Sequence, residues 1–137
     1  VMAGSDIVAL DATGRPRLDG LSFAETVAAL REDGTLVMAD CGSFEDAQRA
    51  ARAGVDIVST TLAGYTGDRV KTDGPDLELL REVVAAFPDV PVICEGRVHT
   101  PEQAAAAIEA GAFAVIVGTA ITHPTSITTW FKAAVEG

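Results

Sequence analysis

The chain has 137 residues, and 48% of them are hydrophobic, which is enough to build the core of one domain. Its 20 acidic and 10 basic residues give a net charge of −10, which argues against nucleic-acid binding because no basic stripe is available to neutralise phosphates. No apolar run approaches the roughly 20 residues that cross a membrane, and the first residues lack a secretory signal pattern. Cys41 and Cys94 lack metal-ligand spacing and indicate buried free thiols. We therefore expect a cytoplasmic protein that binds neither nucleic acid nor membrane.

Short apolar runs rich in β-branched residues predict strands that are buried on both faces, as in a parallel sheet. In chain order these runs are residues 6–11, 36–40, 56–61, 90–95 and 113–118. Each run is followed by a segment with apolar residues at helical spacing, such as Phe23, Val27 and Leu30. This alternation predicts parallel strands joined by right-handed helical crossovers.

Capping residues mark where the helices begin. Ser22 and Glu25 have the spacing of a capping box, and Thr100 precedes Pro101, which suits the first helical position. Pro75 and Pro124 are predicted to begin the third and fifth helices in the same way.

An internal repeat relates residues 43–58 to residues 100–115, with an offset of 57 residues, or two strand–helix units. Both copies carry an Ala-Gly pair at the predicted helix end, and Ala3-Gly4 before the first strand resembles a third copy of that pair. A repeat of two units is typical of a (β/α)₈ barrel that is built from similar quarters.

The two longest strand-to-helix connections are residues 12–21 and 62–74. Loops at the carboxyl ends of parallel strands are where α/β proteins place their functional sites. The residues at these ends are Asp11, Asp40, Thr60-Thr61, Glu95-Gly96-Arg97 and Gly118-Thr119.

Three of the five predicted strands end in an acid, and an acid is costly to bury unless it is paired or hydrogen-bonded. Glu95 closes an apolar run and suits general acid–base chemistry, whereas Asp11 or Asp40 could instead cap a helix or order a loop. Gly96 and the Gly118-Thr119 pair predict phosphate binding, because glycine lets backbone N–H groups approach an anion. The alternative is that these glycines only make turns.

Five motifs in order resemble those of the N-acetylmannosamine-6-phosphate 2-epimerase family, over essentially the whole chain. The segment at residues 54–66 resembles GTTLSGYT, and the segment at residues 92–104 resembles VIAEGR-x-x-TPEQA. Three shorter segments, residues 6–17, 38–43 and 117–122, resemble ADIIALDAT-x-RxRP, MADCST and VGSAIT.

The resemblance implies an isomerase of carbohydrate metabolism and sialic acid catabolism that inverts C2 of an amino-sugar phosphate, without a cofactor or a metal. A base would remove the proton next to the C1 carbonyl, and an acid would return one to the other face. The motifs assign Glu95 to catalysis. They assign the sugar to Asp40, Asp11, Arg15 and Arg97, and the phosphate to Gly96, Gly118, Thr119 and His123.

The sequence departs from the family pattern in three places. His123 stands where the family usually has Arg, and Gly42 stands where it has Ser. The family's first three strands, with the catalytic Lys of the third, have no counterpart here, and neither Lys71 nor Lys132 falls at a predicted strand end.

We therefore expect an α/β fold of partial TIM-barrel type, with residues 1–137 as the C-terminal part of a single domain and five units matching strands 4 to 8. Five strands cannot close an eight-stranded barrel, so we expect a homo-oligomer or completion by the missing N-terminal strands, and little activity from the chain alone. The alternatives are a non-catalytic sugar-phosphate-binding protein, or another phosphate-binding barrel isomerase such as a pentulose-phosphate epimerase or a thiazole synthase.

Overall fold

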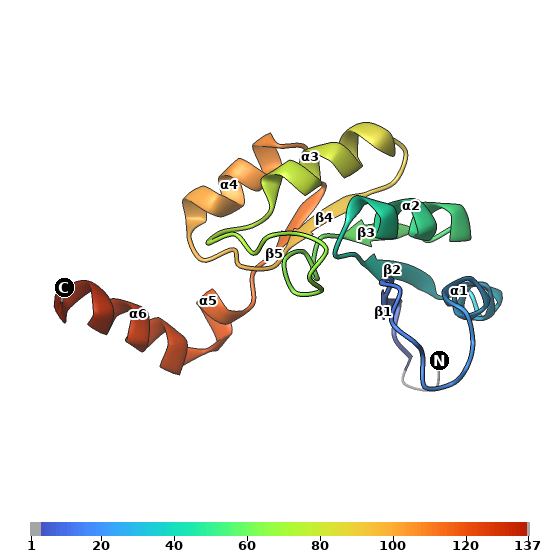
Figure 1. Cartoon of the computed structure of the whole chain (residues 1–137), viewed down its shortest axis with the longest axis horizontal. Helices are drawn as coiled ribbons and strands as arrows, with labels where there is room; N and C mark the ends of the chain where they lie inside the picture. The colour runs from blue at the N-terminus through green and yellow to red at the C-terminus, as the bar shows by residue number, and fades with distance from the viewer. Residues whose placement is uncertain (1–3, 137) are drawn as a thin grey trace.

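The computed structural model describes residues 4–136, in which one parallel sheet has the strand order β1-β2-β3-β4-β5 (Figure 1). The strands are β1 (Ile7–Asp11), β2 (Leu36–Asp40), β3 (Ile57–Ser59), β4 (Val92–Glu95) and β5 (Ala114–Ile116). The helices are α1 (Phe23–Glu32), α2 (Phe44–Ala53), α3 (Leu77–Ala86), α4 (Pro101–Glu109), α5 (Thr119–Thr122) and α6 (Pro124–Glu136). Sequential strands joined by helices are the arrangement of a TIM-barrel wall, as predicted.

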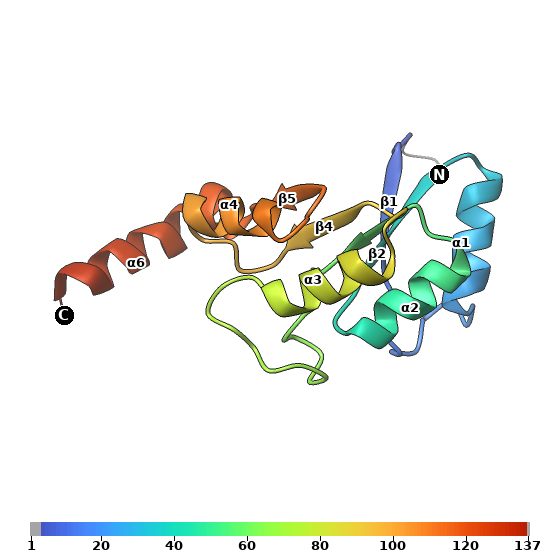
Figure 2. The same ribbon diagram turned by 90° about the horizontal axis from the view of Figure 1, so that it is seen from above.

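Helices α1 to α4 form a layer along one side of the sheet, each packed against the next, whereas α6 extends away from the other elements (Figure 2). The strand register places Asp11 opposite Asp40, and Asp40 opposite Ser59. The carboxyl ends of the strands therefore meet at one edge of the sheet. No helix among residues 4–136 is long and apolar enough to cross a membrane.

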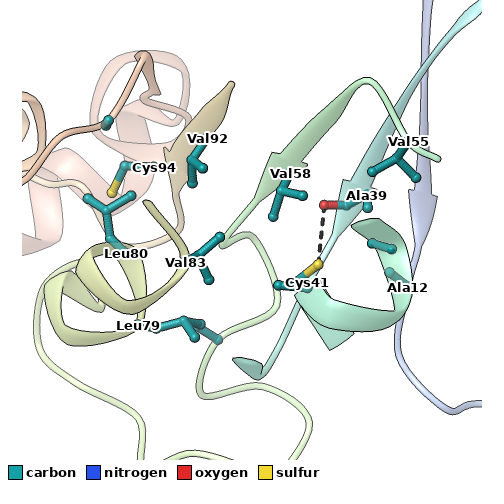
Figure 3. Packing of buried hydrophobic residues seen from close by; sticks show 14 of the residues in the cluster. Ala12, Ala39, Cys41, Val55, Val58, Leu79, Leu80, Val83, Val92 and Cys94 are labelled. Carbon is teal, nitrogen blue, oxygen red and sulfur yellow. Dashed lines mark hydrogen bonds between the residues drawn. The ribbon is translucent and has the colours of Figure 1, made fainter. Parts of the chain in front are cut away.

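The core lies between the sheet and its helices and consists of small aliphatic side chains (Figure 3). Val58 from the sheet and Leu79, Leu80 and Val83 from α3 have at most 1% exposure. Cys41 and Cys94 are buried free thiols, as predicted, and loss of hydration raises the pKa of both. The low aromatic content explains why this core depends on valine, leucine and alanine.

The prediction that every strand is buried on both faces is wrong. Exposed and half-buried residues alternate along β1, and exposed Ile7 and Ile116 lie on the two edge strands. Only one side of the sheet is covered by a helical layer, so side chains that point to the other side keep contact with solvent.

The predicted helix starts are confirmed with one exception. Ser22 forms its capping box, Thr100 caps α4 with proline at the first helical position, and α6 begins at Pro124. The exception is α3, which begins at Leu77 because the Asp76 carboxylate accepts a hydrogen bond of 2.9 Å from the backbone N–H of Leu79. Pro75 therefore lies before the cap and not within the helix.

The internal repeat is visible in the elements, because α2 and α4 begin 57 residues apart, as do β3 and β5. Gly54 and Gly111 end the repeated helices with φ of 80° and 101°, the left-handed conformation that glycine adopts without strain. Ala3, of the third Ala-Gly pair, lies outside the described residues. Strands β3 and β5 are shorter than predicted, because they end at Ser59 and Ile116.

Candidate active site

The carboxyl end of β3 supplies the hydroxyl groups around which the acids gather. The Thr61 hydroxyl lies 2.8 Å from Asp40 Oδ1 and 2.9 Å from Glu95 Oε2. The Ser59 hydroxyl lies 2.6 Å from that of Thr61 and 3.3 Å from Glu95 Oε2. Two of the predicted site residues, on β2 and β4, are thus joined across β3 by one side chain.

The backbone of Glu95 is fixed by the buried residue Thr60. The Thr60 hydroxyl lies 3.0 Å from the Glu95 carbonyl oxygen and accepts a hydrogen bond of 3.2 Å from the Glu95 N–H. Because Thr60 is 1% exposed, this clamp is shielded from water. The Glu95 carboxyl group is therefore held on a strand and not on a loop, which suits a group that must keep its distance to a substrate.

Burial raises the pKa of the Asp40 carboxyl group, and the negative charges of Glu95 and Asp11 raise it further, against the lowering effect of the Thr61 hydrogen bond. The site therefore concentrates negative charge at the ends of β1, β2 and β4. Perturbed carboxyl groups of this kind are common where protons are transferred.

Asp11 and Arg15 form a separate pair at the end of β1. The Arg15 guanidinium lies 2.9 Å from the Asp11 carboxylate, and both side chains are exposed. Asp11 also accepts hydrogen bonds from the N–H and the hydroxyl of Thr13. The structure places the two residues at the same edge of the sheet as Asp40, with Arg15 on the loop that follows β1.

A cavity of about 340 Å³ lies beside Glu95, between the ends of β4 and β5. It brings together Glu95, Gly96, Arg97, Gly118 and Thr119, five of the predicted site residues. The remaining lining residues are Thr61, Leu62, Tyr65, Val98, His99 and Ile116. Gly96 has φ of 100°, and a side chain there would lie 3.3 Å from the Thr61 carbonyl oxygen, so the backbone at this position needs glycine.

Arg97 turns toward the long loop at residues 62–74. Its guanidinium donates hydrogen bonds to the carbonyl oxygens of Ala63 at 2.6 Å and Gly74 at 3.1 Å, and to the Thr72 hydroxyl at 3.0 Å. It also lies 5.1 Å from the ring centroid of Tyr65. No ion pair joins it to Glu95 within residues 4–136.

His123 lies between α5 and α6, outside the residues that line this cavity. Its Nδ1 accepts a hydrogen bond of 3.3 Å from the Ser126 N–H and lies 2.7 Å from the Ser126 hydroxyl, so the imidazole closes the first turn of α6.

Sequence reasoning named Thr60 and Thr61 only as a strand end and did not name Ser59 as a site residue. The available signal was the run of three hydroxyl residues directly after the apolar part of that strand. Tyr65 was also missed, and its ring lies against both Arg97 and Lys71. Within residues 4–136, no three His, Cys, Asp or Glu side chains gather in a way that could hold a metal ion.

Comparison with known proteins places this chain in a family. A family model described as "Putative N-acetylmannosamine-6-phosphate epimerase" matches residues 1–137. A protein of Cutibacterium acnes named "Putative N-acetylmannosamine-6-phosphate 2-epimerase" is 60% identical over 136 residues, which cover 98% of this chain and 59% of that protein. The chain belongs to the N-acetylmannosamine-6-phosphate epimerase family.

Two further relatives agree with this family. The bifunctional enzyme NanE/NanK of Brucella melitensis is 44% identical over 136 residues, which cover 98% of this chain and 25% of that protein. The solved structure of the N-acetylmannosamine-6-phosphate 2-epimerase of Clostridium perfringens matches with a TM-score of 0.91 and 42% identity, over 96% of this chain and 57% of that one. The predicted partial TIM barrel is confirmed, and the chain spans 59% or less of these relatives.

Proposed function

We propose that this member of the epimerase family takes part in the interconversion of N-acetylmannosamine 6-phosphate and N-acetylglucosamine 6-phosphate. The observation that carries the proposal is the cavity of about 340 Å³ that Glu95 lines together with Gly118 and Thr119. An acid–base residue and open backbone in one cavity suit a sugar phosphate, which presents a reacting carbon and a phosphate on one molecule.

Glu95 supports the proton transfer at C2. The proton next to a carbonyl is acidic enough for a positioned carboxylate to remove, and the same group in its acid form can return a proton. Inversion needs a second group on the other face of C2. The described residues offer no lysine at a strand end for that role, since Lys71 lies over the Tyr65 ring and Lys132 lies on α6.

The phosphate is assigned to Gly96, Gly118 and Thr119, with His123 as a further contact. Space is open around Gly118, where an added side chain would meet no atom within 4 Å, so an anion can approach the backbone there. Asp40 is assigned to the sugar together with Asp11, Arg15 and Arg97. Because Asp40 and Glu95 share Thr61, a sugar bound at Asp40 lies next to Glu95.

The setting of the reaction follows from the same proposal. We expect a cytoplasmic step in sialic acid catabolism that needs no cofactor, and an assembly in which a second copy or further strands cover the open edges of the sheet at β1 and β5. A non-catalytic sugar-phosphate-binding protein is the second candidate, favoured by the absence of a strand-end lysine among the described residues.

The experiment uses the protein produced from its complete reading frame, with N-acetylmannosamine 6-phosphate in D₂O followed by NMR. We expect loss of the C2 proton signal and formation of N-acetylglucosamine 6-phosphate. Calorimetry should show that the 6-phosphorylated sugar binds far more tightly than the free sugar. Binding without exchange would favour the non-catalytic candidate, and equal affinity for the two sugars would contradict the phosphate site.

A further inference from the structure

The Thr61 hydroxyl lies between two carboxyl groups and cannot by itself supply a hydrogen for every contact that it makes. Three oxygen atoms surround its hydroxyl, those of Ser59, Asp40 and Glu95, at 2.6, 2.8 and 2.9 Å. A hydroxyl has one hydrogen to donate and two lone pairs that accept. Thr61 can therefore donate in one of these contacts and must accept in the other two.

Counting hydrogens shows that the two hydroxyl groups are not enough. Each contact of this length between two oxygens is favourable only with a hydrogen between them. The Ser59–Glu95 contact of 3.3 Å is longer than this, so Ser59 and Thr61 supply two hydrogens for the three short contacts, and an ionised carboxylate supplies none. The third hydrogen must come from a carboxyl group, so the arrangement is fully hydrogen-bonded only when Asp40 or Glu95 is protonated.

We propose that the Thr61 hydroxyl is a proton-sharing link between Asp40 and Glu95, through which the pair holds one proton and passes it from the first acid to the second. In this step the Thr61 proton moves to Glu95 Oε2 while the Asp40 proton moves to Thr61 Oγ1. The O–H bonds of Asp40 and Thr61 break and those of Thr61 and Glu95 form, so no proton is gained or lost. Thr61 is a positioning residue here, because it acts through Glu95.

The surroundings favour Asp40 as the holder of the proton at rest. Burial and the neighbouring charges of Glu95 and Asp11 raise its pKa. The hydrogen bond from Thr61 to an ionised Glu95 is then a charge-assisted one, which is stronger than a bond between neutral groups. The other titratable groups near the pair are Arg15 beside Asp11, Cys41 after β2, and Tyr65, Arg97 and His99 around the cavity.

This link deepens the proposed function and rests on it, because its role would be to return a proton to Glu95 after Glu95 has given one to C2. Its titration, however, is independent of catalysis. Two interacting carboxyl groups take up protons in two steps that belong to the pair. The Thr61 hydroxyl should widen the pH range between the two steps. It stabilises the state in which the pair holds one proton, because only that state has a hydrogen in all three contacts and also a charge-assisted bond.

The test is an NMR titration of the carboxyl carbons of the protein produced from its complete reading frame, labelled with ¹³C at Asp and Glu. Thr61→Val keeps the shape of the side chain and removes the hydroxyl, so the two steps should move together. Thr61→Ser should restore the separation. Ser59→Ala is the matched control, because it removes a hydroxyl of the same cluster without breaking the link between the carboxyl groups.

The link is disproved if Thr61→Val titrates as the wild type does, if Thr61→Ser fails to restore the separation, or if Ser59→Ala has the same effect as Thr61→Val. The amide spectrum checks the fold of each variant, and Thr61→Ala replaces Thr61→Val if the valine variant does not fold. In the active protein, Thr61→Val should also narrow the pH range of kcat with a smaller effect on KM. A wild type without epimerase activity would contradict the proposed function and leave the titration result standing.

Discussion

Glu95 is the residue through which the proposed chemistry can be tested most directly. Glu95→Gln keeps the size of the side chain and its contacts with Ser59 and Thr61 but removes the ability to carry a proton. In the protein produced from its complete reading frame, kcat should fall by about 10²–10⁴-fold, the usual contribution of a positioned acid or base. KM should change much less. Glu102→Gln, on the exposed first turn of α4, is the control.

Steady-state kinetics on N-acetylmannosamine 6-phosphate would measure both effects. A loss of substrate binding with an unchanged kcat would assign Glu95 to anchoring the sugar, and the proton transfer would then need another residue.

Asp40 should lower the stability of the folded protein at neutral pH. Its pKa is raised on folding, so the folded state binds this proton more tightly than the unfolded state does. The contribution of Asp40 to stability is therefore largest below its unfolded pKa and is lost as the pH rises through its raised folded pKa. Asp40→Asn should raise the free energy of unfolding at pH 7, and the gain should shrink as the pH falls. Urea unfolding of both proteins at several pH values measures this, and a gain independent of pH would contradict it.

His123 has two proposed roles, as a contact to the phosphate and as the residue that caps the start of α6. Arginine keeps its charge at every physiological pH, whereas histidine side chains generally titrate between pH 5 and 8. If residue 123 reaches the phosphate, His123→Arg should tighten sugar-phosphate binding, most clearly above pH 7. The same change removes the Nδ1 acceptor that caps α6 and should cost about 0.5–2 kcal/mol of stability. Calorimetry across pH decides the first effect, and unchanged affinity at every pH would place residue 123 away from the ligand.

At the scale of elements, Arg97 holds the loop at residues 62–74 over the cavity. Its planar guanidinium bonds two carbonyl oxygens and one hydroxyl at once, which the single ammonium of lysine cannot reproduce. Arg97→Lys should therefore speed amide hydrogen exchange in this loop and lower kcat/KM. Arg81→Lys on the exposed face of α3 is the control, since the hydrogen bond of Arg81 within residues 4–136 is a long one, of 3.5 Å to a carbonyl oxygen of its own helix. Exchange rates measured by mass spectrometry that match the wild type would show that the loop is held by other contacts.

The helix boundaries could be predicted from the sequence because their signals are local. Ser22 and Thr100 cap their helices by contacts with residues three positions later in the sequence. Gly54 and Gly111 mark turns that need a left-handed backbone. The exact strand ends could not be predicted, since Thr60 and Thr61 look like strand residues. Both residues lie beyond the last residue of β3, although the Thr60 N–H still donates a hydrogen bond to the Ile93 carbonyl oxygen.

The sequence predicts which residues lie at the carboxyl edge of the sheet, because apolar runs show where each strand ends. The direction of each side chain was not. Arg97 is two residues from Glu95 in sequence, yet its φ of 58° and its contacts with the loop turn it elsewhere. Thr61 contacts both acids because β3 lies between β2 and β4, and this strand order depends on pairing between distant segments.

On the scale of the whole molecule, residues 4–136 form a sheet with two open edges and large exposed apolar side chains. Phe113 is 74% exposed near β5, and Phe131 and Val135 on α6 are 71% and 83% exposed. Exposed apolar surface and unpaired strand edges are sites of association between chains. The polypeptide of residues 1–137, produced by itself, should therefore self-associate, and light scattering measures its size.

The same polypeptide should not be an active epimerase. Inversion at C2 needs a proton donor and a proton acceptor on opposite faces, and the described residues supply Glu95 on one face without a strand-end lysine for the other. The cavity beside Glu95 is also open to solvent, and water weakens every charged contact there. We expect no proton exchange at C2 by NMR in D₂O in the sample used for light scattering. Stoichiometric exchange by a single purified species would overturn this expectation, and Lys71, on the loop that borders the cavity, would then be the residue to replace first.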